Sequence, residues 1–482
     1  DKSVFFADGV SGIGDKRAEF AESTGSFGGC VPARSDRHKK ASFAHFFRVK
    51  IERRTLGSVS HFYYTAFLSV FPHFFEKLFL LLSLSLIAFN SIAEEVESKN
   101  GFKLKIYGQV RADLFYNTRA NVESVDGLFY SYPMDIKPDA EGNDLNDQDN
   151  SNFYLLYSRL GLDVNGPKLG SAKTSAKIEF DFRGSGTTLS LIRLRHAYFN
   201  FNWGKSSVLA GQTWHPFFGE VSPQMLNLNT GAPFQPFSRA PQVRYRFNHK
   251  GLQLTASAVW QSQFLSNGPE GKSNKYIKNS CVPEIHFGAD YKTSNLIVGA
   301  GADMTSLVPR TQATVNGNTY KVDERITSVS GEIHAKYTTP MWQFTAKSTL
   351  ASNLTQTSML GGYGVCDIDP ITGQQSYTPT YNSSSWVNVV WGKKWKVGVF
   401  GGYMKNLGTT KEVSSLIGTG VDVDQIVCGS AEITYNLPHW RIGLEYNYTT
   451  AWYGDLNKAN GKIINTHSVD NHRAVVSASF MF

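Results

Sequence analysis

A period of two between apolar and polar residues runs through most of this chain and restricts its fold more than any other feature. In residues 104–114 and 176–182, every second side chain is apolar or glycine and those between are mostly polar. Such alternation predicts β-strands with one apolar and one polar face. About sixteen segments of this kind follow residue 102. They begin near Leu104, Phe153, Ser175, Ser190, Ser206, Gln242, Leu252, Glu284, Asn295, Ile326, Met341, Ser384, Trp395, Gln425, His439 and Asn471.

The connections between these segments alternate in length. Much longer loops separate the short turns expected at Lys250-Gly251, Thr293-Ser294, Thr339-Pro340, Lys393-Lys394 and Leu437-Pro438. Bacterial transmembrane barrels have an even number of strands, short turns on one side of the membrane and long loops on the other. We therefore predict an all-β fold for residues 102–482: a transmembrane antiparallel β-barrel of about 16 strands, with short periplasmic turns and long extracellular loops.

The composition argues against a helical membrane protein. The chain has 33 Phe and 22 Tyr, yet its mean hydropathy is −0.27. Its one apolar run is shorter than the roughly 20 residues that a membrane helix needs. A sheet in hydrocarbon must close to pair its backbone groups, and about sixteen strands leave a lumen whose inward polar side chains line water. Six tryptophans at strand ends suit the headgroup layers, although aromatic residues also favour strands generally. They are Trp203, Trp260, Trp342, Trp391, Trp395 and Trp440.

The first 101 residues differ from the rest. Residues 73–93 resemble a secretory signal peptide, with Lys77, an apolar stretch from Leu78 to Phe89 and the small-x-small pattern at 91–93. The alternative is a single membrane helix, for which this stretch is short. Residues 1–72 precede any Met and show no periodicity, so we expect a non-native or disordered upstream extension. Residues 94–101 are expected to form a short periplasmic N-terminal segment.

Charge and cysteine content restrict the partners. The net charge is +8, and half of it lies in residues 1–93, so the predicted barrel is too weakly basic to indicate a nucleic-acid partner. The cysteines are Cys30, Cys281, Cys366 and Cys428, with no CxxC pair. Zinc ligation is therefore not expected, and neither is any other metal or cofactor. A disulfide between two of the last three cysteines is possible in an oxidising compartment.

Two stretches resemble known proteins. The last strand alternates Ala474, Val476, Ala478, Phe480 and Phe482, which resembles the terminal recognition signal of Gram-negative outer-membrane proteins. The stretch Ile-Arg-Leu-Arg-His-Ala-Tyr at 192–198, followed by Gly-Gln-Thr-Trp at 211–214 and a long loop, resembles the trimeric DcaP-like porins. The motif match covers only about forty residues, and His215-Pro216 departs from it where a small polar residue is expected. The resemblance implies a homotrimer, surrounded by outer-membrane lipid, that takes up small anionic compounds.

The third long loop, residues 215–240, is rich in proline and apolar side chains, which a fully solvated loop would not need. In sixteen-stranded porins the third loop folds inward, and we expect the same here. Its alternative role is packing against a neighbouring subunit or the outer rim. Five polar residues of this constriction loop are candidates for solute contact: Glu220, Gln224, Asn227, Asn229 and Gln235.

Strand parity directs six arginines into the lumen, where guanidinium groups favour anionic solutes. They are Arg111, Arg159, Arg193, Arg195, Arg244 and Arg246. A turn near Thr187 would instead pair Arg193 with Asp181 and Arg195 with Glu179 as cross-strand salt bridges. Arg244 and Arg246 would face Gln253 and Thr255, so they lack an adjacent acid and are the better candidates.

Acidic residues limit these expectations. Several should also face the lumen, so the anion preference should be modest: Asp113, Glu179, Asp181, Glu284, Asp290, Glu332 and Glu445. The first long loop, residues 117–150, is acidic and is either solvated or a calcium site, although its spacing matches no EF-hand. Its acids are Asp126, Asp135, Asp139, Glu141, Asp144, Asp147 and Asp149.

These observations predict an outer-membrane porin for passive diffusion of small hydrophilic, preferentially anionic solutes. An enzyme is not expected, because the histidines are scattered and no nucleophile motif such as GxSxG is present. The alternatives are an outer-membrane barrel hydrolase and a plugged structural or adhesive barrel.

Overall fold

The computed structural model describes residues 96–97, 101–124, 127–184, 191–227 and 231–482. The predicted upstream extension (1–72) and signal peptide (73–93) lie outside the described residues, as does most of 94–101.

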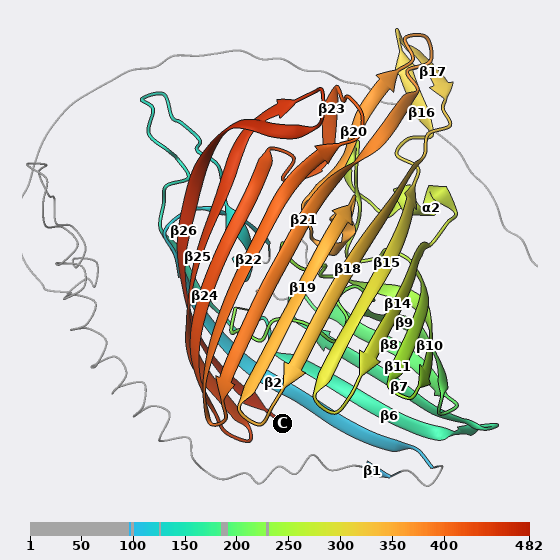
Figure 1. Ribbon diagram of the computed structural model, residues 1–482, viewed down its shortest axis with the longest axis vertical. Helices are drawn as coiled ribbons and strands as arrows, with labels where there is room; N and C mark the ends of the chain where they lie inside the picture. The colour runs from blue at the N-terminus through green and yellow to red at the C-terminus, as the bar shows by residue number, and fades with distance from the viewer. Residues whose placement is uncertain (1–95, 98–100, 125–126, 185–190, 228–230) are drawn as a thin grey trace, which may run out of the picture. The chain divides into compact units, whose positions relative to one another are not determined.

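Within the described residues, sixteen antiparallel strands close into a barrel, because the last strand pairs with the first from Gln109–Met481 to Asn117–Arg473 (Figure 1). Each of the other barrel strands pairs with its neighbours along the chain, which gives an up-and-down topology. In order, they are β2 (Lys103–Asn117), β6 (Arg159–Leu169), β7 (Ala172–Asp181), β8 (Arg193–Asn202), β9 (Ser206–Trp214), β10 (Arg239–His249), β11 (Leu252–Val259), β14 (Glu284–Lys292), β15 (Leu296–Leu307), β18 (Ile326–Thr338), β19 (Trp342–Ser352), β21 (Gln375–Gly392), β22 (Trp395–Thr409), β24 (Val423–Asn436), β25 (Trp440–Asn457) and β26 (Lys462–Met481). The predicted fold class is confirmed.

The remaining elements decorate this barrel, mostly at its loop end. They are β1 (Val96–Glu97), β3 (Asn121–Ser124), β4 (Phe129–Pro133), β5 (Asn150–Tyr154), β12 (Asn267–Gly268), β13 (Gly271–Lys272), β16 (Gln312–Val315), β17 (Asn318–Lys321), β20 (Gly361–Ile368), β23 (Ser415–Thr419), α2 (Lys275–Ser280) and η1 (Thr355–Thr357). Within the described ranges, no helix has the length and apolarity to cross a membrane.

The period of two sorts the side chains as expected. Outward positions form a continuous apolar band, whereas most inward positions are polar and buried. The band includes Ile106, Val110, Ile178, Phe199, Phe287, Val329, Ile333, Val387, Val399 and Ile433. Because no water is available in hydrocarbon, this band together with the closed ladder of backbone hydrogen bonds is what a spanning barrel requires.

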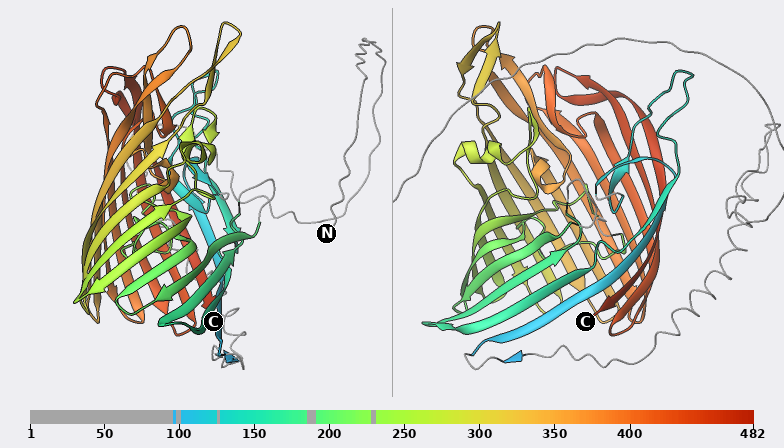
Figure 2. Two further views of the ribbon diagram at one scale, coloured as in Figure 1. Left: turned by 90° about the vertical axis from the view of Figure 1, so that its right-hand side faces the viewer. Right: turned by 180° about the vertical axis from the view of Figure 1, so that it is seen from behind.

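Short turns gather at one end and long loops at the other (Figure 2). All five predicted short turns lie at the turn end. Exposed tryptophans mark the same end: the Trp342 and Trp391 rings lie 6.2 Å apart, and Trp395 lies 4.8 Å from Tyr435. Of the six predicted interfacial tryptophans, Trp260 instead follows β11 at the loop end.

Most strand positions agree with the sequence, and three differ for local reasons. The strand expected from Phe153 is interrupted at residues 155–158, so β5 and β6 pair separately with β2. The strands β21 and β26 begin nine residues before Ser384 and Asn471, because their hairpins continue beyond the barrel wall. The wall is consequently uneven: β7–β11 have 8 to 11 residues, whereas β25 and β26 have 18 and 20.

Candidate functional site

The loop that joins β9 to β10, residues 215–238, lies inside the barrel and contacts widely separated strands. The Arg111 side chain on β2 donates to the Leu226 carbonyl at 2.5 Å. On β25 the Glu445 carboxylate accepts the Asn227 N–H at 2.6 Å. On β21 the Ser384 hydroxyl donates to the Phe234 carbonyl at 2.9 Å. A loop held by strands this far apart in the barrel narrows the lumen.

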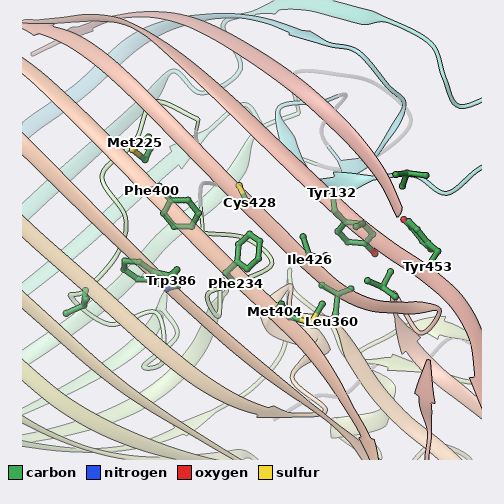
Figure 3. Packing of buried hydrophobic residues seen from close by; sticks show 14 residues of the cluster. Tyr132, Met225, Phe234, Leu360, Trp386, Phe400, Met404, Ile426, Cys428 and Tyr453 are labelled. Carbon is green, nitrogen blue, oxygen red and sulfur yellow. The ribbon is translucent and has the colours of Figure 1, made fainter. Parts of the chain in front are cut away.

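A buried apolar cluster holds the loop against β21–β25 (Figure 3). Met225 and Phe234 of the loop pack with inward residues of the wall, and the Phe234 ring lies 6.1 Å from that of Phe400. The wall members include Trp386, Phe400, Met404, Ile426 and Cys428. The inward face is therefore apolar here, where polar side chains were expected. This patch exists because it is covered by the loop instead of by water.

Charged groups fix the start of the same loop. The Lys347 ammonium on β19 is buried and donates to the carbonyls of Phe217 and Phe218 at 2.5 and 3.1 Å. It also lies 3.6 Å from the Glu332 carboxylate. On β14, Lys292 pairs with Glu220 of the loop at 2.7 Å. Together these contacts hold residues 215–238 against the inner face of the barrel wall.

The candidate solute-contacting residues of this loop divide into two groups. Glu220 and Gln224 are exposed in the lumen. The side chains of Asn227 and Gln235 are buried at 6% and 2% exposure, and their contact with solute stays a prediction. They face the wall because the loop's backbone is anchored on either side of them. Asn229 lies outside the described residues.

An arginine-rich wall lies on β2, β6, β7 and β8. Tyr157, in the interruption between β5 and β6, is surrounded by guanidinium groups: Arg159 lies 4.4 Å from its ring centre, Arg111 5.2 Å, Arg183 5.5 Å and Arg195 5.7 Å. Cations over an aromatic face are attracted by the ring quadrupole. This tyrosine lets like charges lie close together in a confined space.

Carboxylates balance most of this wall. Asp181 accepts two hydrogen bonds from Arg193, at 3.0 and 2.6 Å, and one from Arg195 at 2.9 Å. Arg195 also pairs with Glu179 at 2.5 Å. The predicted salt bridges are confirmed, with one local difference. A register shift places Glu179 opposite His196, so Arg195 sits in a bulge and reaches both acids.

The two other arginines of that wall are less free than expected. Arg111 pairs with Asp113 at 2.8 Å, and Arg159 lies 3.7 Å from Glu179. Arg111 reaches the Leu226 carbonyl of the constriction loop, and Arg159 lies over the Tyr157 ring. The carboxylates of Asp113 and Glu179 in the same wall largely neutralise their charge.

Arg244 and Arg246 on β10 differ because no carboxylate oxygen of the described residues lies within 4.0 Å of either. Arg246 faces Thr255 and Arg244 faces Ser257, so the register is shifted by two residues from the one that would place both arginines opposite Gln253 and Thr255. Arg244 donates to the Trp214 carbonyl at 2.7 Å, and the Nε atoms of both arginines have no hydrogen-bond partner. Both line a lumenal pocket beside the constriction loop, with Glu220, Asp290, Lys292, Glu332 and His334.

The acids of this pocket are already engaged. Glu220 pairs with Lys292, and His334 lies between Asp290 at 2.9 Å and Glu332 at 3.0 Å. The excess positive charge of the pocket therefore belongs to Arg244 and Arg246.

The acidic loop 117–150 and the three cysteines of the barrel were the other features for which the sequence left alternatives open. In loop 117–150, the Asn143 side chain and nearby backbone N–H groups donate to Asp139 and lower the pKa of its carboxyl, and Asp144 pairs with Arg119 at 2.7 Å. No three described acids of this loop converge as a cation site would require. Cys281, Cys366 and Cys428 are all free, so the possible disulfide among them is not formed.

Sequence reasoning missed Tyr157, Lys347 and the buried Arg239, which lies 4.6 Å from the Trp214 ring centre. Lys347 did carry a signal, because it is a charged residue at an inward position of β19. Tyr157 lies where the strand period fails, and no pattern pointed to it.

A closed sixteen-stranded barrel with an apolar outer band, an inward loop and a charged lumen defines an outer-membrane porin. The family model described as "DcaP outer membrane protein" matches residues 82–274, which confirms the resemblance to DcaP-like porins. This class consists of channels, not enzymes.

The chain is similar to several solved structures, of which the first supports the fold. The outer-membrane channel DcaP of Acinetobacter baumannii is 18% identical, with a TM-score of 0.58, and the match covers 80% of this chain and 99% of that one. An outer-membrane protein of Vibrio cholerae, OmpT, is 14% identical (TM-score 0.48; 81% and 100% covered). OmpF of Salmonella typhi, in complex with daunomycin, is 12% identical (TM-score 0.47; 81% and 100% covered). No curated protein matches the sequence.

Proposed function

We propose that this porin passes small hydrophilic solutes by passive diffusion and prefers anionic ones. The observation that carries the proposal is the pair Arg244 and Arg246, which line the pocket beside the constriction loop without a carboxylate partner among the described residues. Arg244 is 7% exposed and Arg246 is half-buried, so Arg246 is the more accessible of the two. Arg193 and Arg195 both pair with Asp181, so their charge is neutralised and they attract a solute only weakly. An unpaired guanidinium can bind carboxylate or phosphate with two hydrogen bonds. Glu220 and the engaged acids keep the preference modest.

The test is the reversal potential across a planar bilayer under a salt gradient. We expect moderate anion selectivity in the native protein and a clear shift toward cations in Arg244→Gln with Arg246→Gln. Lys321→Gln with Lys278→Gln is the matched control, because it removes the same charge from β17 and α2, outside the barrel wall. Selectivity unchanged in the arginine double variant, or cation selectivity in the native channel, would overturn this filter.

We also propose a homotrimer whose subunits meet along the short part of the barrel wall, which β7–β11 form. The strand β9 has 9 residues, which at a rise of about 3.3 Å and a tilt of about 45° cover roughly 21 Å of membrane, less than the usual apolar band of about 25 Å. A partner subunit would cover the loop ends that such a wall leaves at membrane depth. Mass measurement of the detergent-solubilised protein should give three chains per particle, and a monomer would contradict the proposal.

A further inference from the structure

We propose that His215, Glu284 and Asp303 bind a divalent transition-metal cation, of which zinc is the best match. One potential ligand atom from each of these three residues lies within 4.8 Å of the other two. They come from different elements: the start of the constriction loop, β14 and β15. A cation there would tie the loop to the barrel wall.

Burial is the first argument. Glu284 and Asp303 are 0% and 2% exposed, and His215 is 1% exposed. Two carboxylates in one buried site repel each other, and burying an uncompensated charge is expensive. His215 Nε2 lies 2.7 Å from Glu284 Oε1, and the Gln356 amide donates to Glu284 Oε2 at 3.0 Å. Glu284 is therefore satisfied by its neighbours.

Asp303 supplies the second, independent observation. Both of its carboxylate oxygens are buried, and no donor of the described residues lies within 3.5 Å of either in hydrogen-bonding geometry, although the Glu284 and Thr305 side chains are close by. The Nδ1 atom of His286 lies 3.7 Å from Asp303 Oδ1 and also lacks a partner. A cation bound between these groups would compensate the buried carboxylate, to which no described donor is aligned.

The donor set selects the kind of cation. Zinc takes imidazole nitrogen and carboxylate oxygen at about 2.0–2.2 Å, commonly with four ligands. Calcium prefers six to eight oxygens, and magnesium keeps several waters, so neither suits this small mixed set. Binding at His215 Nε2 moves the ring proton to Nδ1, and the 3.2 Å contact that Nδ1 accepts from the Phe217 N–H is then given up. His286 also lines the lumenal pocket, which offers the ion a route of entry.

The experiment uses the full protein, stripped with EDTA, incubated with zinc or cobalt(II) and desalted. We expect about one zinc per chain by elemental analysis, and a cobalt d–d absorption typical of mixed nitrogen and oxygen ligands. Asp303→Asn, which preserves shape, should lower zinc affinity at least about 100-fold and abolish the cobalt band. Glu284→Gln is a second variant in case the first folds poorly. Asp290→Asn is the matched control in the same wall and should retain the ion.

Two results would overturn the proposal. One is native protein that retains far less than one equivalent of zinc. The other is Asp303→Asn and Glu284→Gln retaining as much zinc as native protein, which would assign the ion to surface histidines. Neither result bears on the proposed conductance or selectivity, because the readout is metal content.

Discussion

Replacing residues 217–236 with a short Gly-Ser linker is expected to raise single-channel conductance several-fold. The His215 N–H donates to the Ser238 carbonyl at 2.9 Å, so a short linker can join the two ends without disturbing β9 or β10. The loop contacts β2, β14, β19, β21 and β25 across the lumen, and its removal opens the cross-section that these contacts now close. Current steps in a planar bilayer measure the change.

A deletion elsewhere provides the control for this prediction. Removing the β16–β17 hairpin, residues 312–321, shortens a loop of the same barrel that extends beyond the wall (Figure 1). Its conductance should match that of the native protein. Lys347→Met is a milder version of the loop change, because it removes the donor to Phe217 and Phe218, and it should give noisier and larger steps. Native conductance in the folded 217–236 deletion would show that the loop does not limit flow.

The second large effect is on stability. Asp181→Asn is expected to lower the free energy of unfolding by about 3–5 kcal/mol, because it leaves two guanidinium groups in the wall without their carboxylate. Asp181 is 0% exposed and bonds both Arg193 and Arg195. Denaturant titration in lipid vesicles, followed by tryptophan fluorescence, measures the change.

Asp163→Asn is the matched control, because it removes the same charge from a strand next to β7. Asp163 pairs with Lys177 at 2.9 Å, but its side chain is 40% exposed. An exposed ion pair contributes about 0–1 kcal/mol, so this variant should be nearly neutral. Equal losses in the two variants would contradict a special role for the buried Asp181 pairs.

The fold was predictable because the period of two is imposed at every membrane-spanning residue. One face of each strand must contact lipid and the other must face the lumen, so all sixteen strands show alternating apolar and polar residues in the sequence. The same rule placed the six arginines inward and paired Arg193 with Asp181. The inward position of the constriction loop could also be predicted, because the loop has more apolar side chains than a fully solvated loop would have.

The details of the site depend on local geometry that the period of two does not encode. A bulge in β8 allows Arg195 to reach both Glu179 and Asp181, and the register between β10 and β11 determines that Arg244 faces Ser257. The direction of each loop side chain follows from tertiary packing, which is why the burial of Asn227 and Gln235 was not predicted from the sequence.

The proposed cation site was not predicted from the sequence either. Cysteine spacing argued against zinc, and that reasoning does not extend to histidine and carboxylate ligands. His215, Glu284 and Asp303 are far apart in the chain, and only the pairing of β14 with β15 and the inward turn after β9 bring them together. The departure His215-Pro216 from the family pattern was the one sequence signal at this position.

Single-channel conductance of the purified native protein shows whether this barrel is an open channel. A barrel whose lumen is narrowed but not filled by residues 215–238 should give stable open steps, with a reversal potential that indicates modest anion selectivity. The absence of any conductance from correctly folded barrels would contradict passive diffusion through the lumen and indicate a plugged barrel.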